Sequence, residues 1–283
     1  MFKLVRAHDY FEQQYVLRKS LPTFAAHVGE WEAMSAGAHF AGHSFQVEAY
    51  GAHPRRALEL FKARAGERGK GLAVFIHGGF WRAMHREQSR FMARPFLMRG
   101  WDCAILEYRL MPQFGLRDLV EDIAAALRYL SHHRERLALT PRMAVAGHSA
   151  GAHLALYATM ALRAEGFPLG ESALLFFSGV FDIHPVAPTH LGEETKVTPE
   201  EVAAWSVYSG ASLGGQEAVF VVGGAETPDF QRQSLLGAQQ LCQPGSDEVL
   251  IVDGANHLTL LTEFARDETL CDAILTRLRA FRG

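Results

Sequence analysis

The sequence is poor in cysteine and lacks the common motifs that bind metals through Cys and His. Its 3 cysteines, Cys103, Cys242 and Cys271, are isolated from one another, and neither C-x-x-C nor H-E-x-x-H occurs. Each cysteine lies in an apolar pattern, so we expect buried free thiols in a reducing cytoplasm. The 14 histidines also lack zinc-ligand spacing, and we expect neither a metal nor another cofactor.

Long apolar runs and a strong charge excess are absent as well. No apolar stretch approaches the roughly 18 residues of a membrane-spanning helix. Residues 1–10 lack the apolar core of a secretory signal, so we expect a cytoplasmic protein. The net charge of -3 predicts neither nucleic-acid binding nor attachment to a membrane surface. We expect a small-molecule substrate instead. A homodimer is a possible oligomeric state.

Short apolar runs alternate with helical patterns along most of the chain. The apolar runs that predict buried strands lie at residues 72–76, 103–108, 143–146, 173–177, 218–222 and 248–252. The helical patterns that follow them lie at residues 87–99, 118–132, 152–162, 229–242 and 257–281. Strands separated by helices favour a mostly parallel sheet with helices on both faces, which is an α/β fold.

We expect one main domain, residues 45–283, and an N-terminal helical segment, residues 1–44, that packs on it. Alternating polarity at residues 45–50 predicts a half-exposed strand. Residues 55–70 are basic, and we interpret them as a solvated connection, with a strand and loop or a short helix as alternatives. Residues 183–215 hold several prolines and interrupt the alternation, which is typical of a cap-like insertion beside an active site.

The motif with the clearest chemical meaning is G-x-S-x-G, formed by Gly147, Ser149 and Gly151. An apolar run precedes it at residues 143–146, and an Ala- and Leu-rich stretch without Gly or Pro follows at residues 152–162. Strand, sharp turn and helix in this order predict a nucleophile elbow, which exposes a serine above the sheet. Glycine is needed on both sides because a β-carbon there would collide with the neighbouring strand or helix.

A serine nucleophile needs a histidine base, and that base needs a carboxylate. His257 follows the last predicted strand and is the only histidine after position 190. Glu226 and Asp229 follow the preceding strand, and we prefer Glu226 because Asp229 could instead begin the next helix. The chain order Ser149, acid, His257 is that of α/β-hydrolases, so the α/β-hydrolase fold is the predicted fold.

Such chemistry also needs backbone donors for the oxyanion. The N–H of Ala150, next after the nucleophile, supplies one of them. We expect Gly78 and Gly79 to supply the second, with the Phe80 N–H as a substitute, because they follow the predicted strand at residues 72–76. His77 is an alternative base in principle, although we expect it to hold this loop by hydrogen bonds.

These motifs resemble the kynurenine formamidase (arylformamidase) branch of the α/β-hydrolases, near the hormone-sensitive-lipase-like esterases. The matching motifs are His77-Gly78-Gly79-x-Trp81, Gly147 to Leu154, and Glu226 to Ser234. The sequence departs from the branch in carrying Glu226 where Asp is common and Phe80 where Tyr is frequent. Residues 183–205, which would shape the pocket, carry no close match.

The resemblance implies a serine hydrolase that cleaves an aryl formamide or ester, with N-formyl-kynurenine as the best-known substrate of the branch. Phe80, Trp81 and Phe181 are candidate walls of the substrate pocket, together with Trp205 and Tyr208, and core packing is the alternative for these aromatic residues. A general small-acyl carboxylesterase is an alternative function. A catalytically silent hydrolase fold that acts as a binding protein is an alternative of another class, although such proteins typically lose the Ser or His.

Overall fold

The computed structural model describes residues 6–36, 45–64, 66–169, 172–207, 212–242 and 248–282. Its centre is an 8-stranded sheet with the strand order β1-β2-β4-β3-β5-β6-β7-β8. Strand β2 pairs antiparallel with β1 on one side and with β4 on the other, and all other neighbours pair parallel. The strands are β1 Phe45–Ala49, β2 Ala57–Phe61, β3 Leu72–Ile76, β4 Asp102–Leu106, β5 Met143–His148, β6 Ser172–Phe177, β7 Glu217–Gly223 and β8 Val249–Val252. The mostly parallel sheet predicted from the sequence is therefore confirmed.

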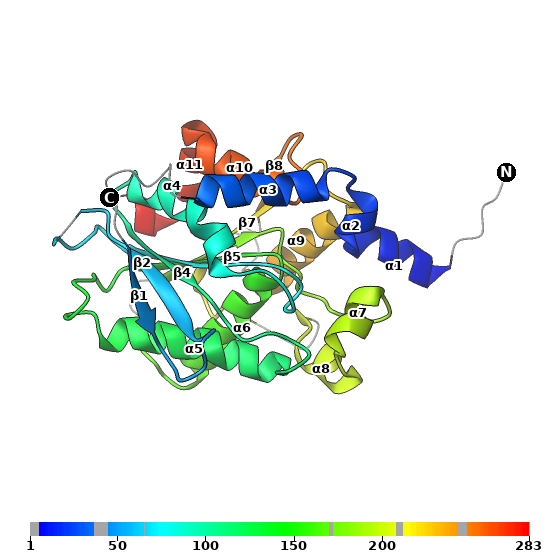
Figure 1. Ribbon diagram of the computed structural model, residues 1–283, viewed down its shortest axis with the longest axis horizontal. Coiled ribbons are helices and arrows are strands. Elements are labelled where there is room, and N and C mark those ends of the chain that lie inside the picture. The colour runs from blue at the N-terminus through cyan, green and yellow to red at the C-terminus, as the bar shows by residue number, and fades with distance from the viewer. Residues whose placement is uncertain are drawn as a thin grey trace.

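Helices cover both faces of this sheet (Figure 1), as predicted. One face carries α5, α6 and α9, and the other carries α3, η1, α4, α10 and α11. The helices are α1 Ala7–Tyr15, α2 Leu17–Ser20, α3 Phe24–Ser35, η1 Arg86–Ala93, α4 Arg94–Leu97, α5 Leu116–His132, α6 Ala150–Ala164, α7 His190–Thr195, α8 Pro199–Ala204, α9 Pro228–Leu241, α10 Thr259–Arg266, α11 Glu268–Leu275 and η3 Arg279–Phe281.

The apolar strands divide their side chains between two cores. In β3, Leu72, Val74 and Ile76 join the core beneath α5 and α6, whereas Ala73 and Phe75 join the core beneath α3 and α10. Successive side chains of a strand point to opposite faces, so a continuous apolar run fills both cores at once. This explains why these strands lack the alternating polarity of β1, of which four of the five residues are exposed.

The interpretation of residues 55–70 as a solvated connection is wrong. Residues Ala57–Phe61 form β2, which is buried along its whole length because it lies between β1 and β4. Its central residue, Glu59, is only 1% exposed, and its carboxylate accepts hydrogen bonds from Arg90 Nε and Nη2, each at 2.6 Å. A carboxylate is rarely buried without a partner, so the charge of Glu59 makes this segment look exposed in the sequence. Its pairing with Arg90 is what allows the strand to be buried.

Two predicted helices are broken in the structure. The helix expected at residues 87–99 is a 3-10 helix, η1, followed by the single turn α4, with Pro95 near its start. The C-terminal helix divides into α10, α11 and η3, and the side chain of Asp267 caps the N-terminus of α11. The shorter helices that result still pack on the same face of the sheet.

The described part of the N-terminal segment, residues 6–36, packs over the C-terminal ends of the strands. Gln233 Nε2 of α9 donates to the Tyr15 hydroxyl at 2.9 Å, and Trp31 Nε1 donates to Thr262 Oγ1 of α10 at 3.2 Å. The described part of residues 183–215 forms α7 and α8 close by (Figure 1). Tyr208 lies outside the described residues.

Cys103 and Cys271 are free thiols that are buried, as expected, whereas Cys242 is only half-buried. Within the described ranges, no helix combines the length and the apolar character needed to cross a membrane.

The turn between β5 and α6 has no room for side chains at its glycines. A β-carbon at Gly147 would lie 2.4 Å from the carbonyl oxygen of Gly151. A β-carbon at Gly151 would lie 2.2 Å from the carbonyl oxygen of Ile76 in β3. Real β-carbons do not approach backbone atoms this closely, so the collision predicted from the sequence is confirmed.

Gly151→Ala should therefore lower the free energy of unfolding by about 2 kcal/mol or more, because the backbone of α6 or β3 must shift. Gly29→Ala in α3 is the matched control, since no atom lies within 4 Å of its new β-carbon. That substitution should raise the free energy of unfolding by up to about 1 kcal/mol through helix propensity. Urea denaturation followed by circular dichroism measures both values, and equal effects would contradict the packing argument.

Candidate active site

Ser149 stands at the turn from β5 into α6, as the sequence predicts. Its backbone has φ 55° and ψ −121°, a left-handed conformation that costs free energy for a residue with a β-carbon. The turn is held by a hydrogen bond from the Ser149 N–H to the Phe177 carbonyl at 2.9 Å. Such strain is characteristic of a nucleophile elbow, which presents the serine hydroxyl at the N-terminus of a helix.

The structure brings Glu226 and His257 together from the loops after β7 and β8. His257 Nδ1 and Glu226 Oε2 lie 2.7 Å apart, and both side chains are buried. The His257 ring also packs against Phe230 at a centroid distance of 4.1 Å. A proton on Nδ1 that is donated to the carboxylate leaves the lone pair on Nε2, which a general base requires.

The second carboxylate oxygen of Glu226 is also fixed. Its Oε1 accepts a hydrogen bond from the Gly223 N–H at 2.7 Å and another from the Ser178 hydroxyl. These donors hold the longer Glu side chain in the orientation that His257 needs. Ser178, at the end of β6, is a residue that the sequence reasoning missed. The only available signal was its position directly after a predicted strand.

Asp229, the alternative acid, has a different partner. Its Oδ1 accepts from Arg232 Nε at 2.6 Å, one turn further along α9. The structure thus pairs Glu226, and not Asp229, with His257.

The loop after β3 faces the serine. A β-carbon at Gly78 would lie 3.0 Å from the His148 carbonyl oxygen and 3.1 Å from Ser149 Cβ, closer than most β-carbon contacts, so the loop backbone approaches the serine tightly here. The Tyr108 hydroxyl donates to the carbonyls of His77 at 2.9 Å and Gly78 at 3.0 Å. In a trans peptide the N–H points opposite to the carbonyl, so the N–H groups of Gly78 and Gly79 point away from Tyr108.

Two of the predicted oxyanion donors are without an acceptor. Within the described residues, the N–H groups of Gly79 and Ala150 donate to no backbone or side-chain oxygen. Gly79 has φ +101°, and Phe80 beside it is also left-handed with φ 48°, so the loop is sharply turned here. Unpaired N–H groups beside a serine are what a developing oxyanion requires.

His77 holds this loop and does not face the pocket. Its Nδ1 lies 2.8 Å from the Gly78 carbonyl, and its Nε2 lies 3.0 Å from Glu107 Oε1. Burial raises the pKa of Glu107, but the hydrogen bond and charge of His77 and the charge of Arg55 outweigh burial, so the pKa is lowered overall. Glu107 therefore stays ionised and anchors the loop, which argues against His77 as the base.

The histidines that flank the serine are structural. His148 Nε2 donates to the His257 carbonyl at 2.9 Å, and His153 Nε2 donates to the Trp205 carbonyl at 2.8 Å. Burial lowers the pKa of His148 well below its ordinary value, and the neighbouring His257 lowers it further. Burial also lowers the pKa of His153 to about 4. Both rings are consequently neutral near pH 7.

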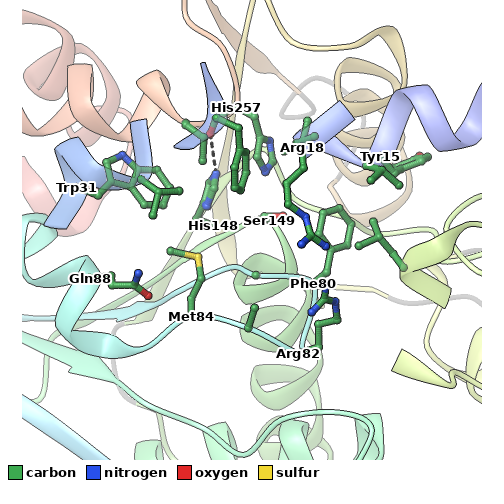
Figure 2. A pocket seen from close by; sticks show the side chains of 18 residues that line it. Tyr15, Arg18, Trp31, Phe80, Arg82, Met84, Gln88, His148, Ser149 and His257 are labelled. Carbon is green, nitrogen blue, oxygen red and sulfur yellow. Dashed lines mark hydrogen bonds between the residues drawn. The ribbon is translucent and has the colours of Figure 1, made fainter. Parts of the chain in front are cut away.

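Ser149 and His257 line a cavity of about 280 Å³. Figure 2 shows Trp31, Met84 and Gln88 at one end of this cavity and Tyr15, Arg18 and Arg82 at the other. Of the predicted pocket residues, Phe80 lines the cavity, whereas Trp81 and Phe181 do not. The side chains that line it are those of Tyr15, Val16, Leu17, Arg18, Phe24, Val28, Trp31, Phe80, Arg82, Ala83, Met84, Gln88, His148, Ser149, Leu191, His257 and Leu258, together with Gly79.

Trp81 and Phe181 lie in the core instead. The Trp81 ring packs on His153 at a centroid distance of 5.2 Å and is 2% exposed. The Phe181 ring is fully buried against Phe176 and Phe220. Aromatic residues at strand ends more often fill the core than a pocket, and this is what the structure has at both positions.

The N-terminal segment builds much of the pocket wall, which the sequence reasoning did not foresee. Leu17 and Phe24, on α2 and α3, line the cavity, and Trp31 lies beside the ring of His148 at 5.8 Å. No motif marks these residues. Only the apolar pattern of the segment indicates that it covers another surface.

The site and fold agree with similarities to known proteins. Residues 58–175 match the BD-FAE family. Kynurenine formamidase of Drosophila melanogaster is 26% identical over 229 residues, which cover 76% of this chain and 75% of that protein. Kynurenine formamidase of Danio rerio is 24% identical over 240 residues, with 80% of each protein covered.

This chain is an α/β-hydrolase that is similar to kynurenine formamidases over most of its length. Among solved structures, the thermophilic carboxylesterase EstE1 from a metagenomic library superimposes with a TM-score of 0.73. That structure is 17% identical, and the alignment covers 91% of this chain and 95% of EstE1. At this identity the similarity establishes the α/β-hydrolase fold of this enzyme, as predicted from its strand order and elbow.

The neutral His153 of this hydrolase makes its stability depend on pH. The folded-state pKa of about 4 lies below the ordinary value of 6.5, so the unfolded chain binds the proton more tightly. As pH falls from 7 to 4, His153 should remove roughly 3 kcal/mol from the free energy of unfolding. His153→Gln keeps a donor for the Trp205 carbonyl, and its stability should fall less over this range. Parallel pH profiles of urea midpoints for the two proteins would contradict the argument.

Proposed function

We propose that this protein is a serine hydrolase that cleaves an aryl formamide or ester through an acyl-enzyme. The observation that carries the proposal is the 2.7 Å contact between Glu226 and His257 beside the cavity that Ser149 lines. The relatives named kynurenine formamidase favour a substrate that resembles N-formyl-kynurenine, with kynurenine and formate as products. We assign Ser149, His257 and Glu226 as nucleophile, base and orienting acid.

In the first half-reaction, Ser149 Oγ attacks the formyl carbon while His257 Nε2 accepts the hydroxyl proton. The carbonyl oxygen gains the negative charge, and the N–H groups of Ala150 and of Gly78 or Gly79 stabilise it. Glu226 stabilises the cationic His257 that results. Collapse of the tetrahedral intermediate breaks the C–N bond, and His257 returns the proton to the departing aryl amine.

In the second half-reaction, a water molecule attacks the formyl ester on Ser149. His257 accepts a proton from this water, and the same backbone donors hold the second oxyanion. The Ser149–carbon bond then breaks, the serine oxygen regains its proton from His257, and the acid product leaves.

The cavity suits an aromatic substrate with a small acyl group. Its walls include the ring of Trp31 at one end and that of Phe80 toward the other, and Leu258 adds an aliphatic surface. Aromatic rings bury a large apolar area, and such walls favour them over small polar substrates. The volume of about 280 Å³ leaves little space for a long acyl chain in addition to an aryl group.

A small-acyl carboxylesterase is the second candidate function. The Phe80 ring has no hydroxyl that could hydrogen-bond to an amide. Its apolar surface therefore accommodates an aryl ester as readily as a formamide. Both candidates use the same three residues, so the difference lies in the ratio of kcat/KM for the two substrates.

The test compares N-formyl-kynurenine with p-nitrophenyl acetate on the wild type and on three variants. Ser149→Ala should lower kcat for both substrates by about 10⁴-fold or more, because no acyl-enzyme forms. Glu226→Gln should lower kcat by about 10³- to 10⁴-fold through the wrong His257 tautomer. Asp229→Asn is the matched control and should stay within a few-fold of the wild type.

Hydrolysis of both substrates by Ser149→Ala would refute the serine mechanism. A wild-type preference for p-nitrophenyl acetate would favour the carboxylesterase over the formamidase. Absence of any hydrolysis by the wild type, together with no labelling of Ser149 by a fluorophosphonate, would favour a catalytically silent binding protein.

A further inference from the structure

One end of the cavity carries two arginines that share a single carboxylate. Arg18 belongs to α2, and Arg82 follows the loop after β3. Arg82 Nη2 lies 2.5 Å from Glu194 Oε2, and Arg18 Nη2 lies 3.6 Å from the same oxygen. Figure 2 shows both side chains at the Phe80 end of the cavity. Segments far apart in the sequence therefore bring two positive charges to the wall of the Ser149 cavity.

These arginines differ from the structural arginines of the protein. Arg90 donates through two nitrogens to Glu59 at 2.6 Å each, and Arg109 donates in a similar way to Asp122. In contrast, neither Arg18 nor Arg82 donates a well-directed side-chain hydrogen bond to another described residue, and both depend on Glu194 for an ion pair. A guanidinium has five N–H donors, so most of their donors are available to a ligand.

The ion pair of Arg18 with Glu194 is long and open to water, whereas Arg82 is 21% exposed and lies closer to the same exposed carboxylate. Glu194 lies on the short helix α7 and is 42% exposed, and Arg18 is 57% exposed. Ion pairs this open to water contribute little to stability, so a second anion can join them or displace Glu194. The other nearby acid, Glu12, is paired with Lys19 and His190. The local charge at the cavity wall is thus positive, with two guanidinium groups against one carboxylate.

We propose that Arg18 and Arg82 bind a carboxylate of the substrate, so the preferred substrates are aryl formamides or esters that carry a carboxylate on the leaving group. This inference rests on the proposed function, because it places the reacting carbonyl at Ser149 in the same cavity. Guanidinium groups bind carboxylates through paired, charge-assisted hydrogen bonds, and the aryl body would lie along Phe80, between Ser149 and the two arginines. Arg18 and Arg82 are therefore specificity-determining residues.

The test uses phenyl acetates whose ring carries a carboxylate on a chain of increasing length, each paired with the corresponding neutral carboxamide. The measured quantity is the ratio of kcat/KM for each carboxylate and its carboxamide. In the wild type this ratio should exceed about tenfold at one chain length, a factor typical of a charge-assisted hydrogen bond. Arg18→Gln and Arg82→Gln should each lower it at least about fivefold. Glu194→Gln should raise it, since a competing carboxylate is lost.

Arg64→Gln is the matched control. Arg64 is 78% exposed and precedes β3, whereas Ser149 follows β5, which is parallel to β3. Arg64 therefore lies near the N-terminal ends of these strands, and Ser149 lies at their C-terminal ends. This variant removes the same charge from the protein and should keep the wild-type ratio. A ratio near one in the wild type, or a wild-type ratio in both Arg18→Gln and Arg82→Gln, would overturn the proposal.

A binding measurement separates this proposal from the proposed function. Calorimetry on Ser149→Ala with the phenol products of the same pairs does not depend on turnover. The carboxylate should bind at least about tenfold more tightly than the carboxamide, and adding Arg82→Gln should remove the difference. Equal binding of the pair overturns the carboxylate site even when the wild type hydrolyses every ester. Selective binding without hydrolysis by the wild type supports the site and refutes the serine mechanism.

Discussion

The close approach of α6 to β3 is the constraint on which the site depends. The backbone of Gly151 lies so near the Ile76 carbonyl that no side chain fits between them. This contact fixes the N-terminus of α6 against the end of β3, and it thereby sets Ser149 opposite the loop that begins at His77. The surrounding structure maintains the left-handed backbone of Ser149, because β5 pairs in parallel with β3 and β6 and the Ser149 N–H donates to the Phe177 carbonyl.

Hydrogen bonds from buried polar groups fix the loops after the strands, which apolar packing alone does not orient. Glu107 and Tyr108 orient the peptides after β3, and Ser178 orients Glu226 against His257. Each of these groups has a hydrogen-bond partner, and buried polar networks whose members are hydrogen-bonded add rigidity. The result is a site whose donors and base are positioned before any substrate arrives, as electrostatic catalysis requires.

The sequence predicts the parts of the site that depend on local geometry. Gly147 and Gly151 identify the elbow, and strand ends locate Glu226 and His257 without any knowledge of packing. The pocket wall could not be predicted in this way, because Trp31 and Arg18 reach the site through long-range packing of the N-terminal segment. For the same reason Trp81 and Phe181 suggest a pocket in the sequence but fill the core in the structure. The buried strand β2 is hidden by the charge of Glu59, whose arginine partner is distant in the sequence.

The central claim is that Ser149 carries the acyl group during turnover. Rapid acid quench of the enzyme during hydrolysis of p-nitrophenyl acetate, followed by mass spectrometry of its peptides, tests this claim directly. The account predicts one acetyl group on the peptide that contains Ser149 in the wild type, and none in Ser149→Ala. Turnover at the wild-type rate with no acetyl group on that peptide, or with the acetyl group on another residue, would contradict it.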